Sequence, residues 1–264
     1  MGSSRKGKPG SDLEHLVMRR VGRAIGDFHM IEPGDRILVG ISGGKDSFVL
    51  MRMLDMHRRR FKFDFDLIPV MVDAGWDPDG AIRAMKMMAR QGFDVELIER
   101  KIKQTVEQKL RPGSNPCALC SRLRRGFLYD LAQERSCDKI ALGHHLDDFV
   151  ETLLLNLFYT GQLKSMGVNM RSDDGRNRII RPLVYVESQL LVRLVREYGF
   201  MPVDLDCPHT SFKKEPQREM VRNLVSRLAS KNPRIRRSML AAMKHVRPSH
   251  LMDKFLMEDS KSDT

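Results

Sequence analysis

The chain lacks the features of membrane and secreted proteins. It has no apolar stretch near the roughly 20 residues that a bilayer-spanning helix needs. Its first residues, Met1–Pro9, contain no apolar segment of the kind found in a secretory signal peptide. Only 4 of the 264 residues are cysteine, too few for a disulfide-built scaffold. These absences predict a cytoplasmic protein with no membrane partner and a loose N-terminus over residues 1–11.

Aromatic residues are also scarce, at 6% of the chain, and they do not alternate with the basic runs. The stacking platforms of single-strand binders are therefore not indicated. The chain is instead rich in positive charge. It has 46 Lys and Arg residues and 34 Asp and Glu residues, which gives a net charge of +12. A basic soluble surface is one explanation. The clustering at 58–60, 122–125 and 234–237 favours a polyanionic partner such as a folded RNA, held through its phosphates.

Apolar runs alternate with helical patterns along the first two thirds of the chain. This alternation predicts an α/β fold with a doubly wound parallel sheet over residues 12–165. A smaller, mainly helical C-terminal portion follows over residues 166–264. Pro69 places the strand at 65–72 near an edge of the sheet. The strands are expected at 37–41, 65–72, 93–98 and 139–142, with an extended piece at 178–183. The helices are expected at 13–30, 47–60, 78–91, 120–135, 145–160, 187–199, 215–230 and 233–245.

A glycine loop at 42–47 lies between the first strand of this sheet and a helix. Such a loop directs backbone N–H groups and a helix N-terminus at a phosphate. It is not a Walker A loop, because Val39 stands where that motif has its first glycine and Asp46 where it has a hydroxyl. It resembles the PP-loop of ATP pyrophosphatases, which cleave ATP between the α- and β-phosphates. A plain turn between strand and helix is the structural alternative.

The residue types in this loop suit a bound pyrophosphate. Glycines let the backbone approach it, two serines offer hydroxyl groups, Lys45 supplies a positive charge and Asp46 can hold Mg²⁺. Asp73 follows the next strand, at the edge of a parallel sheet where nucleotides bind. The predicted nucleotide-binding residues are Ser42, Gly43, Gly44, Lys45, Asp46, Ser47, Asp73, Gly143 and His145.

Three carboxylates start the helix predicted at 145–160. Asp147, Asp148 and Glu151 can share one helical face, where they would bind Mg²⁺ or act as a base. Helix capping alone explains either aspartate. The adjacent His144 and His145 fit either a nucleotide contact or a packed core.

The sequence Cys117-Ala-Leu-Cys120 stands where a helix is predicted to start, beside several arginines. Both features favour thiolates. Cys207 is a third candidate ligand, and spacing alone favours zinc, with His209 as the fourth ligand, over an iron–sulfur cluster with one open iron. The pattern is also compatible with a redox pair and, less readily in a cytoplasmic chain, with a structural disulfide. Cys137 is interpreted as a buried, inert thiol.

Three segments together resemble the TtcA family, the tRNA 2-thiocytidine synthetases, over about residues 12–255. They are Ser42–Ser47, Pro116–Gly126 and Gly143–Thr152, and the segment 248–253 is also similar. The resemblance implies ATP-dependent thiolation of a cytidine in the tRNA anticodon loop, at position 32. It also implies a [4Fe–4S] cluster on Cys117, Cys120 and Cys207, which reverses the preference for zinc.

The same resemblance implies an order of chemistry. The cytosine C2 oxygen attacks the α-phosphate of ATP, Lys45 and an Asp46-bound Mg²⁺ offset charge on pyrophosphate, and sulfur then displaces AMP. Asp148 is the candidate catalytic base. Arg124 is expected to contact the cytosine or the phosphates of ATP, with a solvated helix face or a tRNA phosphate contact as the alternatives. The implied partners are tRNA, ATP and a cysteine desulfurase, and the C-terminal helices are compatible with a homodimer. A 2-thiouridine synthetase, a lysidine-forming ligase and a zinc-stabilised tRNA-binding module remain alternatives.

Overall fold

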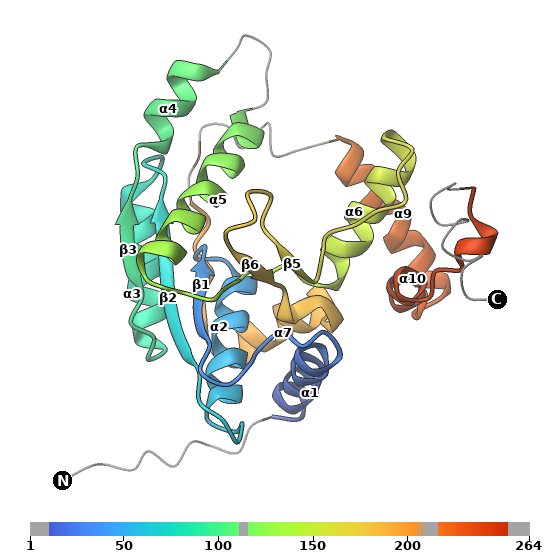
Figure 1. Cartoon of the computed structure of the whole chain (residues 1–264), viewed down its shortest axis with the longest axis horizontal. Helices are drawn as coiled ribbons and strands as arrows, with labels where there is room; N and C mark the ends of the chain where they lie inside the picture. Colours follow the sequence, from blue (N-terminus) through green and yellow to red (C-terminus); the bar gives the residue numbers. More distant parts are fainter. Residues whose placement is uncertain (1–10, 111–115, 206, 208–215, 253–264) are drawn as a thin grey trace.

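The computed structural model describes residues 11–110, 116–205, 207 and 216–252 (Figure 1). Its centre is a six-stranded sheet in the order β3-β2-β1-β4-β6-β5. Every neighbouring pair is parallel except β5 and β6. The strands are β1 (Arg36–Ile41), β2 (Asp66–Asp73), β3 (Glu96–Glu99), β4 (Lys139–Ala141), β5 (Asn169–Arg171) and β6 (Arg178–Ile180). The predicted doubly wound α/β fold is confirmed.

Helices cover both faces of this sheet. Side chains alternate along β1, so Ile37, Val39 and Ile41 face one apolar core while Leu38 faces the other. The first core is closed by α1 (Asp12–Asp27), α2 (Lys45–Arg58), α3 (Pro78–Arg90), α6 (Leu146–Tyr159), the 3₁₀ helix η1 (Pro182–Tyr185) and α7 (Ser188–Glu197). The second core is closed by α4 (Ile102–Lys109) and α5 (Pro116–Glu134). Within the described ranges, no helix is both long and apolar enough to cross a membrane.

The C-terminal helices pack on α6 at one end of the sheet (Figure 1). They are α9 (Pro216–Lys231) and α10 (Ile235–Lys244), followed by the short η2 (Pro248–His250). Val221 and Val225 of α9 and Leu240 of α10 are buried in the first core. The predicted division at residue 165 stays a prediction, but β5 and β6, which follow it, belong to the main sheet.

Three local expectations differ from the structure. The helix α4 was not predicted from the sequence. The strand β2 lies inside the sheet, not near an edge, and Pro69 is tolerated there because β3 pairs with β2 only from Val70 onward. The helix predicted from residue 120 already begins at Pro116, so Cys117 and Cys120 both lie in its first turns. Residues 1–10 and His209 lie outside the described residues.

Candidate active site

The phosphate loop joins β1 to α2 and is held by contacts within itself. Ser47 Oγ donates to the Gly44 carbonyl at 3.0 Å and accepts from the Ser42 N–H at 3.1 Å. The two serine hydroxyls are 3.1 Å apart. Gly44 occupies the N-cap position of α2 and offers no side chain there, which leaves the first N–H groups of the helix open to an anion. The loop is therefore shaped for a phosphate before any ligand arrives.

Two glycines allow the close approaches that this loop requires. Gly43 has a φ of +79°, and a Cβ placed on it would lie 2.8 Å from Ala84 Cβ of α3. A Cβ on Gly143 would lie 3.1–3.3 Å from backbone atoms of Asp46 and Ser47. Gly143 thus lets the chain after β4 pack directly against the start of α2. The structure gives this predicted nucleotide-binding residue a packing role beside the loop.

A compact cluster of ionisable side chains joins the start of α2 to the start of α6. Lys45 Nζ is 2.8 Å from Asp46 Oδ1. The buried His145 places Nε2 3.8 Å from the same Asp46 oxygen and Nδ1 3.3 Å from Asp148 Oδ2. The Asp148 carboxylate also accepts the His145 backbone N–H at 2.8 Å, as part of a capping box. Burial raises the pKa of Asp148, while the nearby His145 opposes that rise.

The other two carboxylates of this helix bind arginines of α9 and α10, which counts against the hypothesis that all three surround one ion. Glu151 accepts hydrogen bonds from two guanidinium nitrogens of Arg222, Nε at 2.9 Å and Nη2 at 3.2 Å. Asp147 accepts the Ser188 N–H at 2.7 Å and pairs with Arg236 at 2.8 Å. These contacts fasten α9, α10 and the start of α7 to α6. Asp148 stays beside the loop through His145, and Asp147 Oδ2 also lies 3.7 Å from His145 Nδ1.

His144 is a packed histidine. Its Nδ1 accepts a hydrogen bond from Arg181 Nε at 3.1 Å. Burial, and secondly the charge of Arg181, lower the pKa of His144 to about 4. The ring is therefore neutral at physiological pH and serves as an acceptor for Arg181.

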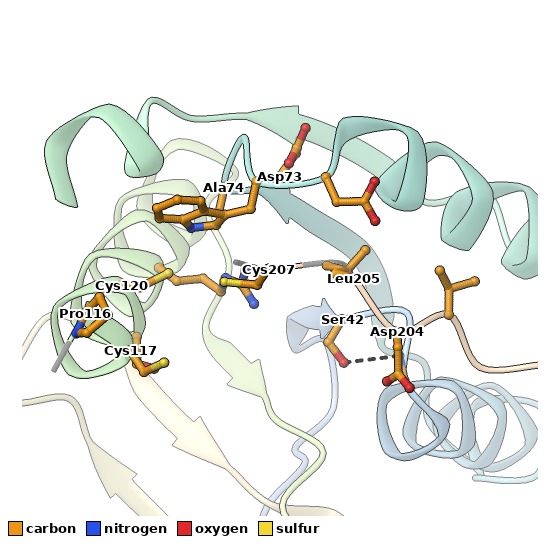
Figure 2. A pocket seen from close by; sticks show the side chains of 15 residues that line it. Ser42, Asp73, Ala74, Pro116, Cys117, Cys120, Asp204, Leu205 and Cys207 are labelled. Carbon is orange, nitrogen blue, oxygen red and sulfur yellow. Dashed lines mark hydrogen bonds between the residues drawn. The ribbon is translucent and has the colours of Figure 1, made fainter. Parts of the chain in front are cut away.

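A cavity of about 350 Å³ opens beside the phosphate loop (Figure 2). Seven of the residues predicted for the site line it: Ser42, Gly44, Asp73, Cys117, Cys120, Arg124 and Cys207. The remaining ones, Gly43, Lys45, Asp46, Ser47, Gly143, His145 and Asp148, belong to the loop and the ionisable cluster beside it. One cavity thus joins the loop to three cysteines from two separate parts of the chain, the start of α5 and residue 207.

The three cysteines are reduced thiols, partly exposed to this cavity. Figure 2 shows the Cys120 and Cys207 side chains directed toward one another, with Cys117 on the preceding turn of α5. Among the residues that the structure describes, no three His, Cys, Asp or Glu side chains stand in a metal-holding arrangement. The donor set, three cysteine sulfurs around one cavity, suits a thiolate-bound metal centre. Cys137 is buried in the second core, away from the cavity lining, as predicted.

Sequence reasoning missed one wall of the cavity. Trp76, the only tryptophan of the chain, lines it just beyond Asp73, and Lys103 Nζ lies 5.8 Å from its ring centre. Asp73 accepts the Gly75 N–H at 2.8 Å, which turns the chain toward Trp76. The segment 203–205 also lines the cavity, and its Val203 N–H donates to the Gly43 carbonyl at 3.1 Å. Trp76 could have been predicted as a cavity residue from its position, three residues after the end of β2 at Asp73.

The fold and this site define a nucleotide-binding protein of the PP-loop class. The family model for the PP-loop domain matches residues 13–227. The chain belongs to the family of tRNA-cytidine(32) 2-sulfurtransferases, as predicted from its motifs. It is 44% identical over 240 residues to the one from Geobacter metallireducens, covering 91% of this chain and 93% of that protein. It is 43% identical over 247 residues to the one from Syntrophotalea carbinolica, covering 93% and 95%.

A solved structure shares the fold across nearly the whole chain. It is the U34-tRNA thiolase NcsA from Methanococcus maripaludis with its [4Fe–4S] cluster. The TM-score is 0.72 at 22% identity, and the match covers 96% of this chain and 92% of that one.

Proposed function

We propose that this protein is an ATP-dependent tRNA sulfurtransferase that converts cytidine 32 to 2-thiocytidine. In the first step the C2 oxygen attacks the α-phosphorus of ATP, and the bond to the β-phosphate oxygen breaks. In the second step sulfur bonds to C2, and the C–O bond breaks to release AMP. The single observation that carries this proposal is the shared cavity, which has the phosphate loop and three reduced thiols around one space.

The residues of the phosphate loop act on the leaving pyrophosphate. The N-terminus of α2 and the Ser42 hydroxyl receive its oxygens, Ser47 holds the loop in shape from within, and Lys45 offsets the charge that builds up. Asp46 is the residue placed to hold Mg²⁺, which PP-loop chemistry would use to neutralise the phosphates. Arg124 lines the cavity and contacts either the cytosine or the α-phosphate. Asp148 is the candidate base. Burial raises the pKa of its carboxyl group, which makes the carboxylate a better proton acceptor.

Cys117, Cys120 and Cys207 are proposed to hold a [4Fe–4S] cluster. With three protein ligands, one iron of such a cluster would have no protein ligand and would supply a binding position for sulfur. Cys117 and Cys120 both lie in the first turns of α5, so one helix supplies two of the three proposed ligands. A cysteine desulfurase is the proposed source of sulfur, and the cytoplasm the proposed location.

The test is a thiolation assay with anaerobically purified protein, a tRNA transcript, ATP, Mg²⁺ and sulfide. Mass spectrometry of the digested tRNA is expected to show 2-thiocytidine at position 32, and iron and sulfide analysis to show about four of each per chain. Cys137→Ala is the matched control, which should keep both the iron and the activity. Thiouridine as the product would assign a different substrate. Zinc in place of iron, with unmodified tRNA, would favour a binding module and contradict the proposal.

A homodimer remains a proposal, and α6 offers the surface for it. Leu157, Phe158 and Tyr159 at the end of α6, and Leu163 just after it, are exposed apolar side chains. Replacing Phe158 by Ser is expected to shift a dimer to monomer in light scattering. A wild-type monomer would exclude this assembly.

A further inference from the structure

A second hollow lies apart from the active site, between α1, η1 and α10. Its volume is about 310 Å³, and it shares no lining residue with the active-site cavity. Four basic side chains surround it: Arg20 and Arg23 from α1, and Arg237 and Lys244 from α10. We call this hollow the basic pocket.

The basic pocket has more positive charge than its neighbours neutralise. Two carboxylates contact the four cations. Glu187 lies 3.8 Å from Arg20 and 2.8 Å from Arg237. Asp27 lies 3.5 Å from Arg23 and 3.3 Å from Lys244. Four positive charges against two negative ones leave an excess of two.

The excess positive charge affects the pKa of Arg20, the least exposed of the four cations. Arg20 has a side-chain exposure of 17%, and its Nη1 donates to the Tyr185 carbonyl at 3.4 Å. Burial lowers the pKa of Arg20, and the charge of Arg237 lowers it further, against the attraction of Glu187. An anion in the pocket would relieve both effects, because it would add negative charge between two guanidinium groups.

The shape and lining of the pocket favour a phosphodiester over a bare anion. Guanidinium groups match phosphate oxygens in geometry, and two of them approach here from different helices. Leu146, Leu240 and Ala241 form an apolar part of the lining, against which a ribose can pack. The Tyr185 hydroxyl, which accepts from Lys244 Nζ at 2.6 Å, lies at the same place.

The pocket is also connected to the catalytic cluster by position. Leu146 lines it and directly follows His145, whose ring faces Asp46 of the phosphate loop. The surrounding helices are basic as well, since residues 216–244 contain one acid, Glu219, against eight Lys and Arg. Those eight are Arg218, Arg222, Arg227, Lys231, Arg234, Arg236, Arg237 and Lys244. A long polyanion reaching the active site would pass along this surface.

We propose that the basic pocket binds a backbone phosphate of the tRNA substrate, and so orients the RNA while its target base enters the active-site cavity. This inference rests on the proposed function, because it takes the polyanion to be the tRNA that the enzyme modifies.

The test compares tRNA binding by the full-length protein with Arg23→Gln, Arg237→Gln and both changes together. These side chains are 72% and 55% exposed, so their replacement by a neutral polar residue leaves the core intact. Arg90→Gln on α3 is the matched control, because it removes the same charge far from α10 in the view of Figure 1. Affinity for a tRNA transcript is measured by fluorescence anisotropy over a series of salt concentrations, with melting curves for every variant.

Each pocket variant is expected to weaken tRNA binding by about tenfold and to reduce the slope of log affinity against log salt by about one. Arg90→Gln is expected to match wild type, and ATP affinity to be unchanged throughout. Pocket variants that bind tRNA like wild type would overturn the inference. So would variants that lose affinity for inorganic phosphate but not for tRNA, because the pocket would then serve a small anion.

The two proposals fail in different ways. Wild-type protein that thiolates tRNA, with pocket variants of unchanged tRNA affinity, contradicts only the basic pocket. Wild-type protein that binds no tRNA at any salt concentration overturns the pocket and the proposed function together. If Arg237→Gln lowers the melting temperature, Arg23→Gln alone still decides the outcome.

Discussion

Two walls of the active-site cavity, the phosphate loop and the cysteines, are built in different ways. The phosphate-loop wall is continuous in sequence and closes on itself through Ser42, Gly44 and Ser47. The sulfur wall joins the start of α5 to Cys207, which comes from a distant segment of the chain. That segment meets the loop through the Val203 N–H and the Gly43 carbonyl. The comparison teaches that the loop depends on local geometry, whereas the sulfur wall depends on the fold.

The largest effect is expected from Cys207→Ser, which removes one thiol of the sulfur wall only. Thiolated tRNA should become undetectable, because serine does not replace a soft thiolate ligand. ATP affinity, measured by calorimetry, should stay within about twofold of wild type, since the loop wall is untouched. Cys137→Ala is the control for loss of a thiol. If Cys207→Ser also abolished ATP binding, the two walls would not be independent.

Lys45→Ala tests the opposite wall. Removal of one preorganised charge from the site of the leaving pyrophosphate should lower kcat/KM for AMP formation by about 10²–10³. Asp46 then also lacks the ammonium group now 2.8 Å away. Iron content should be unchanged, because Lys45 does not line the sulfur wall. A Lys45→Ala variant that forms AMP normally but contains no iron would contradict this assignment, because Lys45 would then support the metal centre and not the pyrophosphate.

This difference also explains what the sequence could predict. Some features are local sequence patterns and could be predicted from the sequence alone. These are the phosphate loop, the pair Cys117 and Cys120, and the alternation of strands and helices. The partners of Asp147 and Glu151 could not, because Arg236 and Arg222 reach them from helices far along the chain. Trp76 and α4 were missed for a related reason. The positions of Trp76 and α4 depend on where β2 and β3 end in the sheet. The hydrophobic periodicity of the sequence does not predict those ends.

Gly43→Ala probes the contact between the loop and its surroundings. Its φ of +79° and the 2.8 Å approach to Ala84 Cβ combine backbone strain with overpacking. The free energy of unfolding should fall by about 2–4 kcal/mol, measured by urea denaturation. Gly175→Ala is the matched control, with a φ of +73° and nothing within 4 Å of the added Cβ. It should cost only the strain of about 1–2 kcal/mol. If both variants lost the same free energy of unfolding, Ala84 would be able to move away from the added Cβ without cost.

Acid should weaken the fold through His144, close to the loop wall. Its pKa is near 6.5 in the unfolded chain and about 4 in the folded one, so the unfolded state binds the proton more readily. This contribution is complete above pH 6.5 and is lost as the pH falls toward 4, by at most about 3 kcal/mol. His144→Gln keeps an acceptor for Arg181 and should flatten the stability profile over that range. A variant profile as steep as that of wild type would assign the acid sensitivity to other groups.

The smallest effect is expected from Cys137, the cysteine that belongs to neither wall. It packs in the second core with Ile140 and Leu131, and burial raises the pKa of its thiol, so it stays protonated and unreactive. Cys137→Ala removes one buried sulfur and should cost about 1 kcal/mol of stability, read from urea denaturation. Iron content and thiolation should match wild type. Loss of iron in this variant would show that the sulfur wall draws on a fourth cysteine and that burial in the core does not separate structural thiols from ligands.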